Sequence, residues 1–405
     1  MMTGIFALSN AARSLALLAP SLAFPALAHA HPDPDAFSRT AFVDPPATVE
    51  CTLEDGTETT CHELILSALP GGLEIGPFCP ATLDETGGIW DWDGAEAGLY
   101  RIDRAFLEML AEQGFRFFDE SGAVAIGDPG EGQPDAEHAC LSASLKPDVT
   151  MTIRIPAEPR MADAPTPLGT VAKIGVALDG VPIFADAPSV LDTGHMPALD
   201  TCGGHVDPGG WYHWHATSTD VDTVLDREGV EAGCGAVAQD ASAQFGYALD
   251  GYPMFGGREA DGSVPEDLDE CGGHVGPTSA GETYHYHARE TFPNLPSCLV
   301  GVVAEDNFTT TADRGIGSLA QLEGGRPPDG PGGMPPGFAR AAETLGVEPE
   351  VLMEAVRAAG GPRANLAAAA ATLGVTEEAL REALPPPRRD GPRPEGPDQV
   401  ERTDP

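Results

Sequence analysis

Two matched groups of histidines are the residues of this chain whose types and spacing could do chemistry. Each group starts with a Cys-Gly-Gly-His tetrapeptide, and a His-x-His pair follows eight or eleven residues after that histidine. Imidazole is the commonest metal ligand among side chains, and three imidazoles with one open position are a known arrangement for catalytic zinc. Copper is equally compatible with such ligands. Six of the eleven histidines belong to these triplets: His205, His213, His215, His274, His285 and His287.

The elements that must position these rings can be predicted locally. Residues i and i+2 of an extended strand point to one face, so the two histidines of each His-x-His pair should converge. The Gly-Gly pairs before His205 and His274 tolerate positive φ, which lets each loop turn the third ring toward the pair. Asp200 and Asp269 could orient a metal ligand by hydrogen bonding to it without binding the metal themselves. The two triplets could form two sites or one shared site, and both arrangements remain open.

An alternative without metal also remains open. Histidines and tyrosines can alternate along a strand simply to build a hydrogen-bonded polar core. His195, beside Met196, occurs in the first half only and is more typical of an ordinary loop histidine. Two triplets with matched flanks favour metal ligation over the structural interpretation.

The flanks of the histidines are also duplicated, which predicts the fold class. Residues 175–184 correspond to residues 246–255 at an offset of 71, and the cysteines correspond at an offset of 69. Each copy reads as a short strand, an Asp-Gly turn and a second strand near a proline. We therefore predict a mainly β protein, with a duplicated, disulfide-pinned core, long loops and a small C-terminal α-helical appendage.

Composition changes along the chain suggest its organisation. Residues 103–111 have the apolar spacing of an amphipathic helix, with Asp103 as the N-cap and Gly114 as the stop. The predicted segments are a signal peptide (1–30), a flexible lead-in (31–50), a cysteine-bearing region (51–149), the duplicated domain (150–305), a Pro/Gly-rich linker (306–337), a helical repeat module (338–384) and a disordered tail (385–405).

The N-terminus and the cysteines predict export. An apolar run followed by Ala28-His29-Ala30 is typical of a cleaved secretory signal, so we expect a periplasmic or secreted protein that does not span a membrane after cleavage. An even number of cysteines in an exported chain favours disulfides. Sequence alone does not determine the pairing, although the duplication makes Cys51–Cys61, Cys79–Cys140, Cys202–Cys234 and Cys271–Cys298 the simplest set.

The charge balance excludes one class of partner. The chain has 63 acidic and 22 basic residues, for a net charge of −41. Nucleic-acid binding requires a basic surface, so we predict none. A protein partner could instead dock on the C-terminal helices.

The histidine segments resemble the YHYH domain family of exported proteins. Residues 284–287 read Tyr-His-Tyr-His, whereas the first copy has Trp214 in place of the second tyrosine. The resemblance covers roughly residues 150–305. The family has no settled activity, so the resemblance implies the region and its key histidines, and the chemistry must come from the residues.

Two functional hypotheses follow. The first is an exported protein that holds copper or zinc through the six histidines, and whose metal could support hydrolysis or redox chemistry. The second is a non-enzymatic extracellular binding or scaffolding module in which the histidines are structural. No nucleophile motif and no phosphate-binding glycine loop is present, so the sequence identifies no catalytic residue and no organic cofactor.

Overall fold

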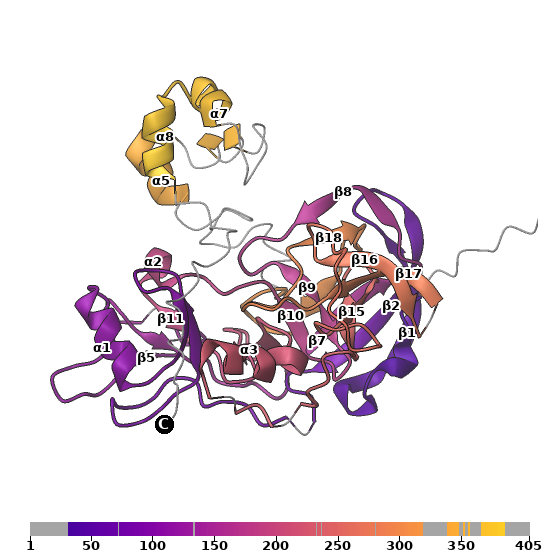
Figure 1. Cartoon of the computed structure of the whole chain (residues 1–405), viewed down its shortest axis with the longest axis horizontal. Coiled ribbons are helices and arrows are strands. Elements are labelled where there is room, and N and C mark those ends of the chain that lie inside the picture. Colours follow the sequence, from indigo (N-terminus) through magenta and orange to yellow (C-terminus); the bar gives the residue numbers. More distant parts are fainter. Residues whose placement is uncertain are drawn as a thin grey trace, which may run out of the picture.

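The computed structural model describes residues 31–71, 73–132, 134–231, 233–235, 237–279, 281–318, 338–347, 351–352, 355–356 and 366–384. Strands arranged in several sheets dominate these residues, which confirms the predicted mainly β class (Figure 1). The predicted signal peptide and the predicted C-terminal tail lie outside the described residues. None of the helices in the described part of the chain has the length and apolarity needed to cross a membrane.

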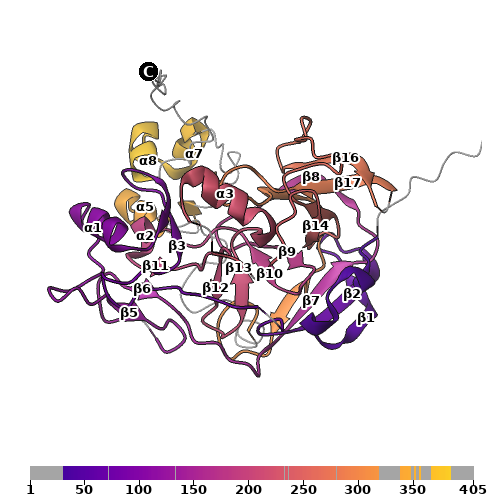
Figure 2. The same ribbon diagram turned by 60° about the horizontal axis from the view of Figure 1, so that its bottom comes forward.

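An eight-stranded sheet contains both copies of the duplicated sequence. Its strand order is β12 (Gly204–Val206), β13 (Tyr212–Trp214), β10 (Pro182–Phe184), β9 (Lys173–Ala177), β14 (Gln244–Ala248), β15 (Pro253–Phe255), β17 (Gly281–His287) and β16 (Gly273–Thr278). The second four strands repeat the first four in mirrored order, and β9 and β14 pair antiparallel at the middle. Figure 2 shows β12 and β13 on one side of this region and β16 and β17 on the other. Each repeat therefore ends at its own edge of the sheet.

A second sheet covers this one and completes the main core. It is antiparallel, in the order β1 (Phe42–Thr52), β2 (Glu58–Ser67), β7 (Thr150–Pro156) and β19 (Phe308–Thr310). Alternate side chains of β7, such as Met151, Ile153 and Ile155, are buried in one cluster with Ile174 and Val176 of β9. This alternation is the pattern of a sheet with one buried face.

Two segments expected to be irregular contribute to this sheet. Short 3₁₀ helices η1 (Pro34–Ala36) and η2 (Arg39–Ala41) precede β1, which begins inside the segment predicted as a flexible lead-in. β19 lies inside the segment predicted as a linker, and Phe308 on it is buried. Local composition did not indicate β19, because its pairing partner β7 is far away in sequence, and it did not indicate β1, because Asp44, Pro45 and Pro46 are typical of a loop.

Smaller elements form a second core beside the sheets. They are β3 (Ile89–Trp92), β4 (Gly98–Arg101), α1 (Arg104–Glu112), β5 (Ile126–Gly127), β6 (Cys140–Leu141), α2 (Val190–Thr193) and β11 (Met196–Pro197). The predicted helix is confirmed: Oδ1 of Asp103 accepts a hydrogen bond from the amide of Phe106 at 3.0 Å, and Gly114 has a φ of +98°. Four further elements complete the described β region: β8 (Met161–Pro167), which pairs with β18 (Cys298–Gly301), and η3 (Ser218–Asp220), which leads into α3 (Val221–Glu228).

Four disulfides join all eight cysteines. The pairs are Cys51–Cys61, Cys79–Cys140, Cys202–Cys234 and Cys271–Cys298. These are the pairs that the duplication suggested. Closing loops of this size restricts the unfolded chain, which stabilises the folded state.

The C-terminal helices form a small core of their own. They are α5 (Phe338–Leu345), α7 (Leu366–Leu373) and α8 (Glu377–Ala383). Gly346 and Gly374 have left-handed φ values of 67° and 70°, as expected for residues that end helices. Oγ1 of Thr376 accepts from the amide of Ala379 and caps α8, as the sequence predicted. Buried Ala and Leu side chains pack these helices together.

Candidate metal centres

The first histidine cluster consists of His205, His213 and His215. His205 on β12 lies directly opposite His213 on β13 in the antiparallel register, and His215 follows on the same face as His213. Nε2 of His215 lies 3.0 Å from Nε2 of His213 and 3.1 Å from Nε2 of His205. His213 and His215 are buried and His205 is partly exposed. The three rings therefore present their Nε2 atoms to one point.

The second histidine cluster consists of His274, His285, His287 and Glu259. His274 on β16 lies opposite His285 on β17, and their Nε2 atoms are 3.1 Å apart. Oε1 of Glu259 lies 3.2 Å from Nε2 of His274 and 3.8 Å from Nε2 of His287. All four ligand atoms lie within 4.8 Å of one another. This cluster is thus a histidine triplet with an added carboxylate.

Backbone carbonyls determine which ring nitrogen faces each cluster. Nδ1 of His215 donates to the carbonyl of Ala185 at 2.5 Å, and Nδ1 of His287 donates to the carbonyl of Gly256 at 2.8 Å. A carbonyl oxygen can only accept, so Nδ1 carries the hydrogen and Nε2 of the neutral ring presents a lone pair. Nε2 of His287 is buried and has no hydrogen-bond partner among the described residues. Such a nitrogen is free to bind a cation.

Burial keeps five of the six cluster rings in the neutral form that binds metal. It lowers the pKa of His215 and the pKa of His285 to about 4. Burial, together with neighbouring imidazoles, holds the pKa values of His205 and His213 well below the usual range. The pKa of His287 is also lowered, chiefly by burial. A histidine at its ordinary pKa of about 6.5 would be partly charged in mildly acidic solution, whereas these rings remain neutral.

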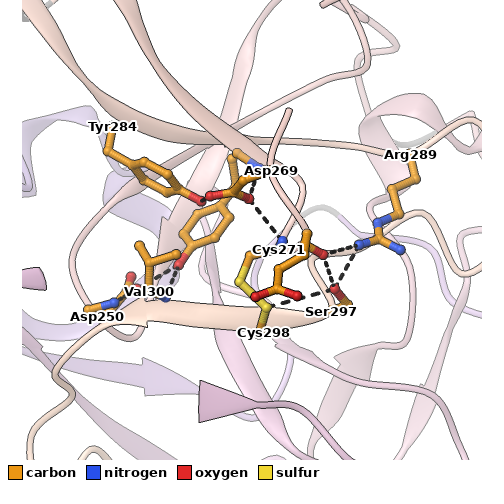
Figure 3. Close-up of a disulfide and its surroundings, with 12 residues drawn as sticks. Asp250, Asp269, Cys271, Tyr284, Arg289, Ser297, Cys298 and Val300 are labelled. Atoms are coloured by element: carbon orange, nitrogen blue, oxygen red, sulfur yellow. Dashed lines mark hydrogen bonds between the residues drawn. A yellow bond between two sulfur atoms is a disulfide. The ribbon is translucent and has the colours of Figure 1, made fainter. Parts of the chain in front are cut away.

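An aspartate ties the second Cys-Gly-Gly turn to the strand that carries the His-x-His pair. Oδ1 of Asp269 accepts from the amides of Cys271 at 2.9 Å and Gly273 at 3.1 Å. Its Oδ2 accepts from the hydroxyl of Tyr284 at 2.9 Å (Figure 3). The turn that carries His274 and the strand that carries His285 are therefore held at a fixed separation.

Asp200 does the same in the first repeat, with one additional donor. Oδ1 of Asp200 accepts from the amides of Cys202 and Gly204, and Oδ2 accepts from the hydroxyl of Tyr212 at 2.8 Å. The amide of Gly76 also donates to Oδ2, at 3.1 Å. The sequence suggested that both aspartates could orient a ligand by a hydrogen bond from outside the metal site. Their bonds run instead to the turn and to the tyrosine, so they position the histidines through the backbone.

The aromatic residue between the two histidines faces the other side of the strand. The hydroxyl of Tyr286 donates to Oδ2 of Asp250 at 2.6 Å and accepts from the amide of Val300 at 2.8 Å (Figure 3). This anchors β17 to the Asp-Gly turn after β14 and to β18. Trp214, which is also buried, takes this position in the first repeat without a hydroxyl group. The alternation of tyrosine and histidine thus separates anchoring residues from the residues that face the cluster.

The disulfides hold the turns from outside. Cys271, three residues before His274, is bonded to Cys298 (Figure 3). The hydroxyl of Ser297, which precedes Cys298, donates to the carbonyl of Glu270 at 2.7 Å. Nη2 of Arg289 donates to the same serine at 2.7 Å. The turn before the cluster histidine is therefore restrained covalently as well as by hydrogen bonds.

The six predicted histidines come together as two separate clusters. The hairpins that carry them lie at opposite ends of the eight-stranded sheet. Five strand spacings between β13 and β17 correspond to roughly 24 Å along the sheet. The shared-site alternative is therefore excluded. His195 lies elsewhere, and its Nδ1 accepts from the amide of Ala139 at 3.3 Å.

Sequence reasoning missed the two carboxylates of the second cluster. One is Glu259. The other is Asp267, whose Oδ1 lies 2.7 Å from Nδ1 of His274. At the repeat offsets of 71 and 69, their counterparts in the first repeat are Pro188 and Ala198. A search for features common to both repeats therefore could not find them.

The fold and the clusters define a duplicated, disulfide-bonded β protein with two candidate metal centres. Residues 152–265 match the model of the family described as YHYH protein, which confirms the resemblance inferred from the sequence. The matched segment contains the first histidine cluster and ends before His274 of the second. No curated protein and no solved structure matches the chain.

Proposed function

We propose that this chain is an exported metal-binding protein that holds copper or zinc through its two histidine clusters. The ligands in this proposal are His205, His213 and His215 at one end of the sheet and His274, His285 and His287 at the other. The clusters contain only nitrogen and carboxylate donors, which suit borderline cations such as zinc and copper.

The contacts between Nε2 atoms carry the proposal. Nε2 of His215 lies 3.0 and 3.1 Å from the Nε2 atoms of its neighbours, while its Nδ1 hydrogen is engaged by a carbonyl. A neighbouring neutral ring can donate from Nε2 only if its own Nδ1 is not needed as a donor. In the second cluster, Nδ1 of His274 and Nδ1 of His285 both face oxygen acceptors, so their Nε2 atoms, 3.1 Å apart, both carry lone pairs. Two such lone pairs repel one another unless a ring is protonated or a cation lies between them. Burial, which lowers the pKa of His285 to about 4, disfavours protonation. A bound cation resolves the conflict in the second cluster.

The spacing of the nitrogens is also suitable for a metal. With metal–nitrogen bonds of about 2.0–2.1 Å, nitrogens 3.0–3.1 Å apart subtend roughly 90–100° at the ion. Three ligands at such angles occupy one side of the ion and leave the other side open to water or substrate. The metal would then activate water for hydrolysis, or change its oxidation state if it is copper.

Export rests on the cysteines. Four disulfides and no free cysteine among the described residues are typical of a protein that folds in an oxidising compartment. Together with the apolar N-terminal segment, they support a periplasmic or secreted location.

Metal analysis of protein purified without a histidine tag tests the proposal. We expect close to two equivalents of metal in the wild type and almost none in a variant with His213, His215, His285 and His287 changed to Ala. The control variant H138A/H195A removes two histidines outside the clusters and should retain the metal. Folding of each variant is checked by circular dichroism and by the absence of free thiols.

A folded quadruple variant with wild-type metal content would refute the proposal. Wild-type protein that fails to retain copper or zinc at micromolar concentration would also refute it. Either outcome would favour the alternative of a binding or scaffolding module with structural histidines.

A further inference from the structure

The two clusters differ in charge, although their histidines are equivalent. The second includes the carboxylate of Glu259 among its possible ligands, and Asp267 is hydrogen-bonded to its most exposed ring. The first consists of three neutral imidazoles. We propose that the first cluster selects a singly charged copper ion and the second selects a zinc ion. This inference rests on the proposed function, and it assigns one ion to each site.

The surroundings of the partly exposed histidine show the difference most clearly. His274 has Asp267 on Nδ1 at 2.7 Å and Glu259 on the Nε2 side at 3.2 Å. The equivalent ring, His205, has the backbone carbonyl of Pro197 near it and no carboxylate in its cluster. One repeat therefore places two anionic groups around its ring where the other places a neutral dipole.

Charge compensation favours different ions at the two sites. The cost of moving an ion out of water into a buried site rises with the square of its charge. A doubly charged ion among the buried rings of His213 and His215 would have no anionic ligand from its cluster. In the second cluster, Glu259 is only 20% exposed and supplies that compensation directly. A singly charged ion has a much smaller cost in the first cluster.

The number of ligands leads to the same assignment. Copper in its singly charged state is satisfied by three nitrogen ligands and needs no fourth. Structural zinc is nearly always four-coordinate and takes carboxylate oxygen as well as imidazole. Nε2 of His287 is buried and has no hydrogen-bond partner among the described residues. This unsatisfied nitrogen indicates a bound ion in the second cluster. Glu259 completes a four-ligand set with the three rings.

Two variants isolate the clusters for a test. H285A/H287A retains only the first cluster, and H213A/H215A retains only the second. Each is titrated with zinc and, with ascorbate present to keep copper singly charged, with copper, against chromophoric chelators of known affinity. Four intact disulfides and an unchanged circular dichroism spectrum establish that each variant is folded.

We expect the second cluster to bind zinc at least roughly 100-fold more tightly than the first does. E259Q in the variant that retains the second cluster should weaken zinc binding by about 10- to 100-fold, as removal of groups around a metal commonly does. Copper binding should change less than about threefold, because it does not depend on the carboxylate. The matched control is E282Q, which removes an exposed carboxylate from β17, the strand that carries His285 and His287. It should leave the zinc affinity and the copper affinity unchanged.

The outcomes separate this inference from the proposed function. If neither cluster binds either ion, both fail. If both clusters bind with the same preference, or if E282Q weakens zinc binding as much as E259Q does, only the assignment of ions is wrong. A first cluster that prefers zinc would also overturn it, and would indicate a three-histidine zinc site with an open position.

Discussion

The two ends of the eight-stranded sheet carry the same three histidines in different surroundings. At the first end, the supporting carboxylate Asp200 is buried and accepts four hydrogen bonds. At the second end, Asp269 is exposed and accepts three. The second end has carboxylates beside its rings, and the first has none in its cluster. Duplication thus preserved the geometry of the imidazoles while the charge around them diverged.

The pH dependence of stability in the metal-free protein should distinguish the clusters most strongly. The folded-state pKa values of five cluster histidines lie below the unfolded value of about 6.5: His205, His213, His215, His285 and His287. The unfolded chain therefore binds more protons, and stability falls as pH drops from about 6.5 to 4. His215 and His285, each with a pKa of about 4, contribute up to about 3 kcal/mol apiece.

The first cluster should contribute more of this dependence, because burial lowers the pKa of all three of its rings, His205, His213 and His215. Urea unfolding at pH 4.5 and pH 7 with a chelator present measures it. Removing the three rings of the first cluster should flatten the profile more than removing those of the second. Equal flattening would mean that the two clusters are equally buried in solution.

Removing the supporting aspartates should also have unequal effects. Asp200→Ala leaves buried donors without an acceptor, and we expect a loss of about 3–4 kcal/mol of unfolding free energy. Asp269→Ala should cost about 1 kcal/mol, because water can replace an exposed carboxylate. Denaturant titration measures both values. A larger loss for the second variant would contradict the difference in burial.

The turn disulfides provide a comparison in which no difference is expected. Cys202–Cys234 and Cys271–Cys298 close loops with separations of 32 and 27 residues. The chain-entropy relation gives about 3.5 kcal/mol for each. Thermal or urea unfolding of the two double Ser variants should therefore agree closely. A marked disparity would show that contacts other than loop closure hold one turn.

A further comparison concerns the aromatic residue of the motif. Tyr286→Phe removes the donor to Asp250 and the acceptor for the amide of Val300, both buried, so we expect a loss of about 2 kcal/mol. Trp214→Tyr in the first repeat should not yield a matching gain, because the smaller ring leaves a space in a packed core. Asp179 is the counterpart of Asp250 in the first repeat. A gain in unfolding free energy for the Trp214→Tyr variant would indicate that Asp179 can accept a hydrogen bond from the new hydroxyl.

Much of the fold was predictable because the information is local or duplicated. The Asp-Gly turns, the alternation of His213 and His215, and the N-cap at Asp103 each depend on neighbours within a few residues. The register between repeats then suggested the disulfide pairs. By contrast, β19 was not predicted as a strand, since it forms only by pairing with β7, which is distant in sequence. β1 pairs with its neighbour β2, but Asp44, Pro45 and Pro46 give it the composition of a loop.

What the sequence by itself determined is that two sets of three imidazoles each converge. A His-x-His pair on a strand and a glycine turn held by a disulfide leave those rings few other directions. Only the tertiary structure decided that the sets lie at opposite ends of one sheet, because strand order follows from packing between repeats. It also decided that Glu259 and Asp267 join the second set. Their positions depend on how a long loop folds back over β16, and no local pattern encodes such a return.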